Sequence, residues 1–162
     1  MVIRQLIEHL EREIALYKEL ITALQKETEN LVNRDYKGLY DTVNHKEHIL
    51  VRIDSIGPSR IYLIQEAAKA IGIKDRPSLS LIVERIESGA SVELERCRRT
   101  AISLIESIQE INSLNSIVVK GSLDNINKTL GLLGNFLPSG VYTSNGAFGS
   151  INLKGYQLSE GI

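Results

Sequence analysis

The first 33 residues carry apolar side chains in a regular helical pattern. From Ile3 to Leu31 these side chains are separated by alternating steps of four and three residues, and a polar residue, Thr28, takes one of the positions. This spacing places them along one face of a helix that packs lengthwise against other helices. The pattern predicts a helix over residues 2–33.

A second helical pattern follows a short break at residues 33–35. Asp35 is a suitable N-cap, because its carboxylate can accept the free backbone N–H groups of a first helical turn. Proline removes a helical hydrogen bond, so Gly57-Pro58 predicts a kink or a short break. The spacing then resumes as far as Gly72, which predicts the C-terminal end of the helix. The apolar positions before the proline are Tyr36, Leu39, Val43, Leu50, Ile53 and Ile56, and Lys46 takes one further position of the same face.

Two more helices are predicted beyond a loop at residues 73–77. Ser78 is the expected N-cap of a short helix that ends at Gly89, and Ser91 is the expected N-cap of a last, long helix. In the long helix the apolar residues continue at steps of three and four as far as Leu137, where Pro138 follows. The fold class is therefore expected to be all-α: an elongated antiparallel helical bundle or coiled coil with three long helices, one short helix and a Gly-rich C-terminal tail.

Charge divides the chain into two parts. Lys154 and Glu160 are the only charged residues after Lys128, and seven of the 12 glycines lie in residues 129–162. The end of the chain has neither helical periodicity nor enough clustered apolar surface to fold alone. We therefore expect a helical bundle domain over residues 1–137 and a flexible tail over residues 138–162.

The overall composition excludes several classes of function. Lys and Arg total 19 and Asp and Glu total 20, a net charge of -1, so the chain has no basic excess for nucleic acid. Charges interrupt every apolar run of the N-terminal region, which argues against a signal peptide and against stable membrane insertion. A single cysteine, Cys97, is compatible with a reducing compartment. A cytoplasmic location is therefore expected.

Candidate catalytic or metal-binding residues are few. His45 and His48 are three residues apart on one helical face, a spacing that can hold a metal, but no third ligand is evident and solvated histidines are the favoured interpretation. Cys97 falls on an apolar position and is expected to be a buried structural thiol. Gly131 to Gly134 lack the lysine and the preceding strand of a phosphate-binding loop. We expect no enzyme, no metal and no cofactor.

The last helix becomes less charged and more apolar after Asn112. Lys120, Asp124 and Lys128 are the only charged residues between Asn112 and Leu137, and apolar residues 117–119 are consecutive. A helix that is apolar on more than one face requires a partner. The partner could be a wider core of the same chain, a second copy in a homodimer, or a helix of another protein.

Several segments, taken in order, resemble the FlgN family of flagellar export chaperones. They are a Leu/Glu-rich first helix, Asp35 to Leu39 followed by His45-Lys46-Glu47, the element Ile111-Asn112-Ser113-Leu114-Asn115, and Tyr142 to Gly146 in the tail. Gly57-Pro58 and residues 147–162 depart from the family pattern. The resemblance implies a small cytoplasmic helical protein that holds hook–filament junction subunits before type III secretion. It also implies delivery to the export gate and its associated components.

The falling charge and the widened apolar face of the last helix, together with the resemblance, suggest roles for residues of this helix and of the tail. Asn112 and Asn115 are expected to orient the client by hydrogen bonds, or else to lie in a layer of the bundle and set its register. Tyr142 and Gly146 are expected to dock on the export gate, the alternative being a tail that folds back over the bundle. A structural coiled-coil scaffold without an export role is the competing function. The expected client-binding residues are Ile108, Ile111, Asn112, Asn115, Val118, Val119, Ser122, Leu123, Ile126, Leu130 and Leu133.

Overall fold

The computed structural model of the chain describes residues 2–75, 77–86 and 89–134. Within these ranges every regular element is an α-helix, as the sequence predicted. The tail expected over residues 138–162 lies outside the described residues. The chain divides into unit 1, residues 1–119, and unit 2, residues 120–162, which are described separately. The helices are α1 (Val2–Asn33), α2 (Tyr36–Ala70), α3 (Leu79–Arg85) and α4 (Gly89–Gly134).

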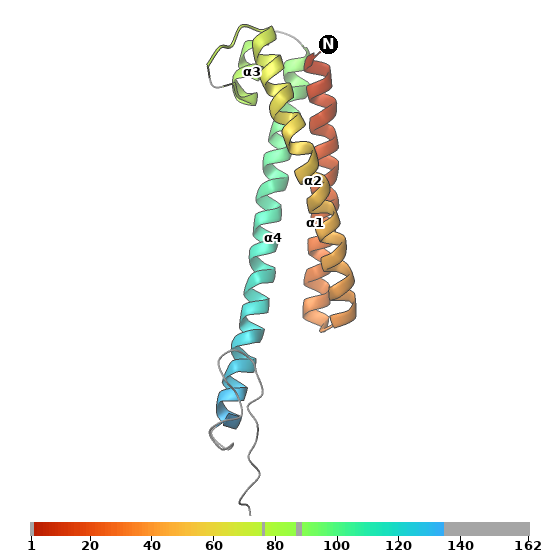
Figure 1. The fold of residues 1–162 in the computed structure, drawn as a ribbon, viewed down its shortest axis with the longest axis vertical. Coiled ribbons are helices and arrows are strands. Elements are labelled where there is room, and N and C mark those ends of the chain that lie inside the picture. Colours follow the sequence, from red (N-terminus) through yellow and green to blue (C-terminus); the bar gives the residue numbers. More distant parts are fainter. Residues whose placement is uncertain (1, 76, 87–88, 135–162) are drawn as a thin grey trace, which may run out of the picture. The chain divides into compact units, whose positions relative to one another are not determined.

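Helices α1 and α2 form a tightly turned hairpin (Figure 1). Arg34, which follows α1, adopts a left-handed conformation with φ 56°, and the backbone N–H of Asp35 donates to the carbonyl of Asn30 at 2.9 Å. The Asp35 carboxylate then accepts the backbone N–H of Gly38 at 2.9 Å, which confirms Asp35 as the N-cap of α2. Free backbone groups at the end of α1 and at the beginning of α2 thus find hydrogen-bond partners within the two-residue connection.

Helix α2 continues through Pro58, so the structure contains no break there. The helix curves along its length (Figure 1), and Pro58 is exposed, so water can reach the carbonyl whose helical partner the proline lacks. At its end, Gly72 adopts φ 77° and the backbone N–H of Ile73 donates to the carbonyl of Ala68 at 2.9 Å. This arrangement confirms Gly72 as the glycine that follows the helix.

Helices α3 and α4 begin and end differently from the prediction. Ser78 is the N-cap of α3, as predicted, and accepts the backbone N–H of Leu81. However, α3 ends at Arg85, and Gly89 begins α4 rather than ending α3. Ser91 is therefore not the N-cap of α4. Its hydroxyl instead donates to the Val83 carbonyl at 2.9 Å, which satisfies an acceptor near the end of α3 and ties the two helices together.

The buried side chains of unit 1 form two apolar clusters. The first cluster lies where α1 begins and joins all four helices, and the second lies further along α1, α2 and α4. Ile49 is completely buried in the second cluster, whereas Leu50, which the sequence pattern places on the core face, is 45% exposed. The first cluster comprises Leu6, Ile7, Leu10, Ala67, Ala68, Ile82, Leu94 and Cys97. The second comprises Leu20, Ala23, Leu24 and Ile49, with Ile53, Ile108 and Ile111 packed against them.

Ion pairs between helices show in which direction each helix of unit 1 runs relative to the others. Arg60 of α2 donates to the buried Glu13 carboxylate of α1 at 2.9 Å, and Arg96 of α4 donates to Glu11 of α1 at 3.1 Å. Burial lowers the pKa of Arg60, but Glu13 and Tyr17 together raise it more, so the pKa of Arg60 lies above its usual value. Residues early in α4 thus contact residues early in α1, which means that α4 runs parallel to α1 and antiparallel to α2.

Candidate functional site

The candidate site lies on α4. It occupies the face of the helix whose first residues are buried in the core. Leu94 and Cys97 are fully buried in the first cluster, and Ile108 and Ile111 are half-buried against the second. Residues three and four apart share one face of a helix, so this stripe continues in sequence to Asn115 and Val119. The predicted client-binding residues Ile108, Ile111 and Asn115 therefore face the hairpin of unit 1.

Asn115 is the last buried side chain of α4 among the residues whose burial is described, with 4% of its surface exposed. Its amide nitrogen donates to the Leu24 carbonyl at 3.1 Å and to the Glu27 carboxylate at 3.0 Å. Its amide oxygen accepts the Thr28 hydroxyl at 2.7 Å. The other oxygen of Glu27 accepts Lys46 of α2, so one polar layer joins α1, α2 and α4.

The sequence carries a signal for this polar layer, because polar residues interrupt the apolar stripes of three helices. Thr28 and Lys46 each take a position of an apolar stripe, and Asn115 takes one in α4. Three polar residues in core positions of three helices predict a shared polar layer if the helices are in register. The expectation that Asn115 orients a client is not tested by these contacts, but its donors and its acceptor are already engaged within unit 1.

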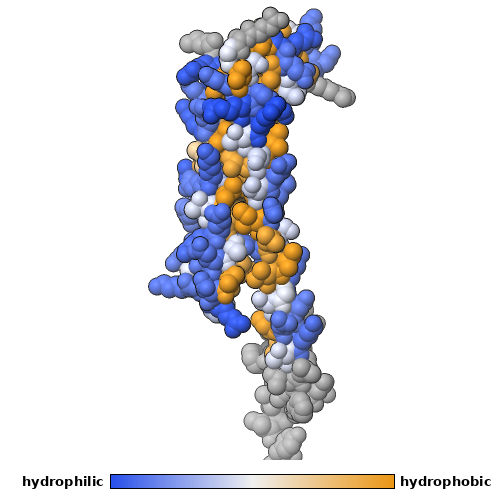
Figure 2. Space-filling model, turned by 180° about the vertical axis from the view of Figure 1, so that it is seen from behind, coloured by the Kyte–Doolittle hydropathy of each residue, from blue (hydrophilic) through white to orange (hydrophobic). Residues whose placement is uncertain are grey.

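Beyond Asn115 the remaining α4 residues of unit 1 are exposed. Val118 and Val119 continue the core-facing stripe, and Val119 is 41% exposed. Leu114 and Ile117 are exposed on other sides of the helix, and so is the predicted site residue Asn112. Figure 2 shows one face of the molecule, on which apolar side chains form a stripe between hydrophilic margins. Aliphatic side chains therefore remain open to solvent at the end of unit 1.

Unit 2 presents the same kind of surface. Leu123, Ile126 and Leu130 are each about half exposed, at 53%, 54% and 49%, and Ser122 is exposed beside them. Their spacing of three and four residues places Ile126 and Leu130 on one face of the helix. The side chain of Leu133, and all of Tyr142 and Gly146, lie outside the described residues.

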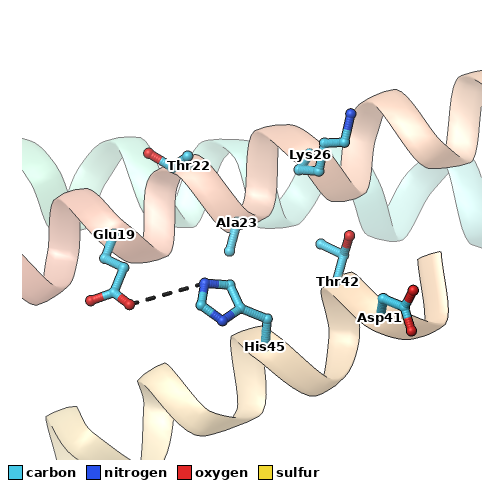
Figure 3. Close-up of a pocket in the computed structure, with 7 residues that line it drawn as sticks. All are labelled: Glu19, Thr22, Ala23, Lys26, Asp41, Thr42 and His45. Carbon is cyan, nitrogen blue, oxygen red and sulfur yellow. Dashed lines mark ion pairs between the residues drawn. The ribbon is translucent and has the colours of Figure 1, made fainter. Parts of the chain in front are cut away.

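The structure gives little support to the other candidate sites, which are a pocket at His45, a metal site and Cys97. A shallow pocket between α1 and α2 is lined by Glu19 and Lys26 on one side and by Asp41 and His45 on the other (Figure 3). His45 lies 4.0 Å from Glu19, as the dashed line shows. Among the described residues no group of three or more His, Cys, Asp or Glu side chains is arranged to hold a metal ion. Burial raises the pKa of the Cys97 thiol and so disfavours the nucleophilic thiolate.

Comparison with known protein families decides the assignment. The family model described as FlgN protein matches residues 1–148, which include all four helices. The chain belongs to the FlgN family. Its members are flagellar export chaperones and not enzymes, so this FlgN-family chain is a chaperone of flagellum biogenesis. Comparisons with curated proteins and with solved structures found no match.

The FlgN match covers the elements that carried the resemblance. Asp35 to Leu39, Ile111 to Asn115 and Tyr142 to Gly146 all fall within residues 1–148. Residues 149–162 lie beyond the match. Within the described ranges, none of the helices combines the length and the apolar character needed to cross a membrane.

Proposed function

We propose that this FlgN-family chain is a cytoplasmic chaperone that binds the terminal helices of hook–filament junction subunits and prevents their premature association. We also propose that it delivers them to the type III export gate. The observation that carries the proposal is the exposed aliphatic surface of α4 in unit 2, to which Leu123, Ile126 and Leu130 contribute. A protein with an exposed surface of this kind has a binding role as its default explanation.

The chemistry of this surface fits an amphipathic helix. Aliphatic side chains three and four residues apart form a stripe on which the apolar face of another helix can pack, with polar margins left in water. Contacts of this kind are short-ranged and adaptable, and no covalent chemistry is needed. Because a client must later be released for export, moderate affinity is favoured over the tightest attainable binding.

Docking on the export gate is the second half of the proposal, and it rests on the family match. Tyr142 is proposed as the anchor, because a tyrosine ring can fill an apolar pocket while its hydroxyl keeps a polar contact. Gly146 belongs to the same proposed docking segment. Both residues lie within the part of the chain that matches the family.

The client surface is tested by placing two charges on it. Leu123→Asp together with Leu130→Asp should reduce the affinity for a synthetic client terminal helix by more than about 100-fold, since each carboxylate would have to be desolvated against an apolar partner. Both side chains are about half exposed, so the helicity of the free protein should be largely unchanged. Calorimetric titration measures the affinity, and circular dichroism measures the helicity.

A matched control places two aspartates elsewhere on α4. Val92 and Ile102 are exposed at 73% and 44%, and Val92→Asp with Ile102→Asp adds the same charge away from the stripe. This variant should bind the client peptide normally. Equal losses in both variants, or a wild-type protein that self-associates stably and ignores the peptide, would favour a scaffold instead. Collapse of helicity in the Leu123/Leu130 variant would mean that these residues are core.

A further inference from the structure

We propose that Asn115 is a latch that holds residues 108–119 of α4 against the α1–α2 hairpin and lets this part of the helix swing away from the hairpin as a rigid rod. The opened gap would receive part of the client helix. The latch itself concerns unit 1 alone. Only its use in client binding rests on the proposed function.

The attachment of α4 is uneven along its length. At its beginning, Leu94 and Cys97 are completely buried with Ile82 of α3, and Ser91 is bonded to α3. Further along, Asn115 is the only other buried side chain of α4 in the described residues, whereas α1 contributes twelve. The backbones of α1 and α2 approach each other closely, but α4 reaches them through its side chains. Within unit 1, α4 is therefore anchored at its beginning, whereas further along only Asn115 is buried and Ile108 and Ile111 are half-buried.

The contacts at Asn115 are of a kind that water can replace. Three of its hydrogen bonds go to the Leu24 carbonyl, the Glu27 carboxylate and the Thr28 hydroxyl, all on α1. When Asn115 moves away, Lys46 still donates to the Glu27 carboxylate, and the Thr28 hydroxyl can donate to the Leu24 carbonyl, which lies 3.0 Å from it. Opening would thus leave the α1 side of the layer partnered, and the asparagine amide would be hydrated. A leucine at this position would instead expose apolar surface to water.

The sequence of α4 permits a pivot at the anchored beginning of the helix but no hinge between that beginning and the latch. Residues 90–120 contain neither glycine nor proline, so this stretch has no built-in kink. Asn115 lies about 32 Å along the helix from Leu94, at about 1.5 Å per residue. A modest rotation about the anchored end would open the far end by about 10 Å, the diameter of a helix with its side chains. The gap would be lined by Ile108 and Ile111 on one side and by Leu20, Leu24 and Ile49 on the other.

The test measures the distance between α1 and α4 in the full chain without a client. Spin labels are placed on Glu29→Cys and Ser116→Cys, which are exposed, while Cys97 is 1% exposed and should not be labelled. Asn115→Asp should produce a second, longer distance, because its carboxylate would stand beside that of Glu27. Adding Glu27→Gln should restore the single short distance, since the glutamine amide can donate to the carboxylate introduced at position 115. Asn115→Leu should stay closed.

Asn112→Asp is the matched control, because it adds the same charge one turn earlier at an exposed position. It should give the wild-type distance. The latch is overturned if Asn115→Asp leaves the distance unchanged or if Asn112→Asp lengthens it equally. If Asn115→Asp loses helicity, Asn115→Ala replaces it, and a distance distribution as narrow as that of the wild type then overturns the latch.

The role in client binding is tested separately. Asn115→Leu should weaken binding of the client peptide by about tenfold, since a closed rod must first be opened at greater cost. Unchanged affinity would overturn this role while leaving the distance result intact. Failure of the proposed function has a different signature: the Leu123/Leu130 aspartate variant would bind normally, whatever the spin labels report.

Discussion

The turn between α1 and α2 leaves no room for a side chain at Gly38. A Cβ atom there would lie 2.5 Å from Oδ2 of Asp35 and 3.1 Å from Oδ1 of Asn30. Asp35 is the N-cap of α2, and the amide nitrogen of Asn30 donates to the Thr42 hydroxyl at 2.8 Å. A methyl group at Gly38 must therefore displace the capping carboxylate or disturb a buried asparagine.

Two opposing effects decide the stability of Gly38→Ala. Alanine favours the helix by about 1 kcal/mol over glycine, while losing the cap and straining Asn30 costs about 2 kcal/mol. We expect the free energy of unfolding to fall by about 1 kcal/mol in urea denaturation. In an Asp35→Ala background the cap is already absent and only the close approach to Asn30 remains, so Gly38→Ala should raise the free energy of unfolding by up to about 0.5 kcal/mol. Equal effects in both backgrounds would show that the close approach does not matter.

At the scale of the element, capping residues were predictable and contacts between helices were not. The predictions for Asp35, Gly72 and Ser78 are confirmed because each residue acts on backbone groups within its own turn. The prediction for Ser91 is wrong because its hydroxyl finds an acceptor on α3, which no local pattern reveals. The sequence predicted a kink or a short break at Gly57-Pro58. The break is absent and α2 curves instead, because Pro58 lies on the exposed side of the helix, where its missing hydrogen bond is least costly.

Helix α2 should therefore become more stable without its proline. Pro58→Ala restores a backbone donor and removes a steric clash, and proline inside a helix costs about 3 kcal/mol relative to alanine. Because the surrounding helix has adjusted to the proline, we expect a gain of about 1–2 kcal/mol in the free energy of unfolding. Urea denaturation measures this gain as a shift of the transition midpoint with an unchanged m value. A loss would mean that the curvature of α2 is needed to seat Ala67 and Ala68 in the core.

At the scale of the whole molecule, the helix order and the family were readable, but the extent of the candidate site was not. The apolar steps of α4 pass through Asn115 without a change of period, so nothing in the pattern marks where burial stops. Ile108 and Ile111 face the hairpin while Leu123 and Leu130 are exposed, although the same spacing describes all four. The polar layer could have been predicted from the sequence, because Thr28, Lys46 and Asn115 each interrupt an apolar stripe. The predicted boundary after Leu137 stays a prediction.

A chain that ends at Leu137 separates the proposed activities. Every buried side chain in the described residues precedes position 116, so the melting temperature should stay within about 4 °C of the full chain, equivalent to about 1–2 kcal/mol at this size. Client affinity should also be retained, because Leu123, Ile126 and Leu130 are present. Binding to the cytoplasmic domain of the export gate should be lost, because Tyr142 and Gly146 are removed.

The matched variant for that truncation is Tyr142→Ala in the full chain. It should weaken gate binding by at least about tenfold, which corresponds to about 1.4 kcal/mol, as expected for the loss of an aromatic anchor. Its melting temperature and client affinity should equal those of the wild type. Gate binding that survives in both chains would place the docking surface before residue 138. A fall of more than about 10 °C on truncation, or a lowered melting temperature for Tyr142→Ala, would instead mean that the tail packs on the helices and contributes a few kcal/mol to their stability.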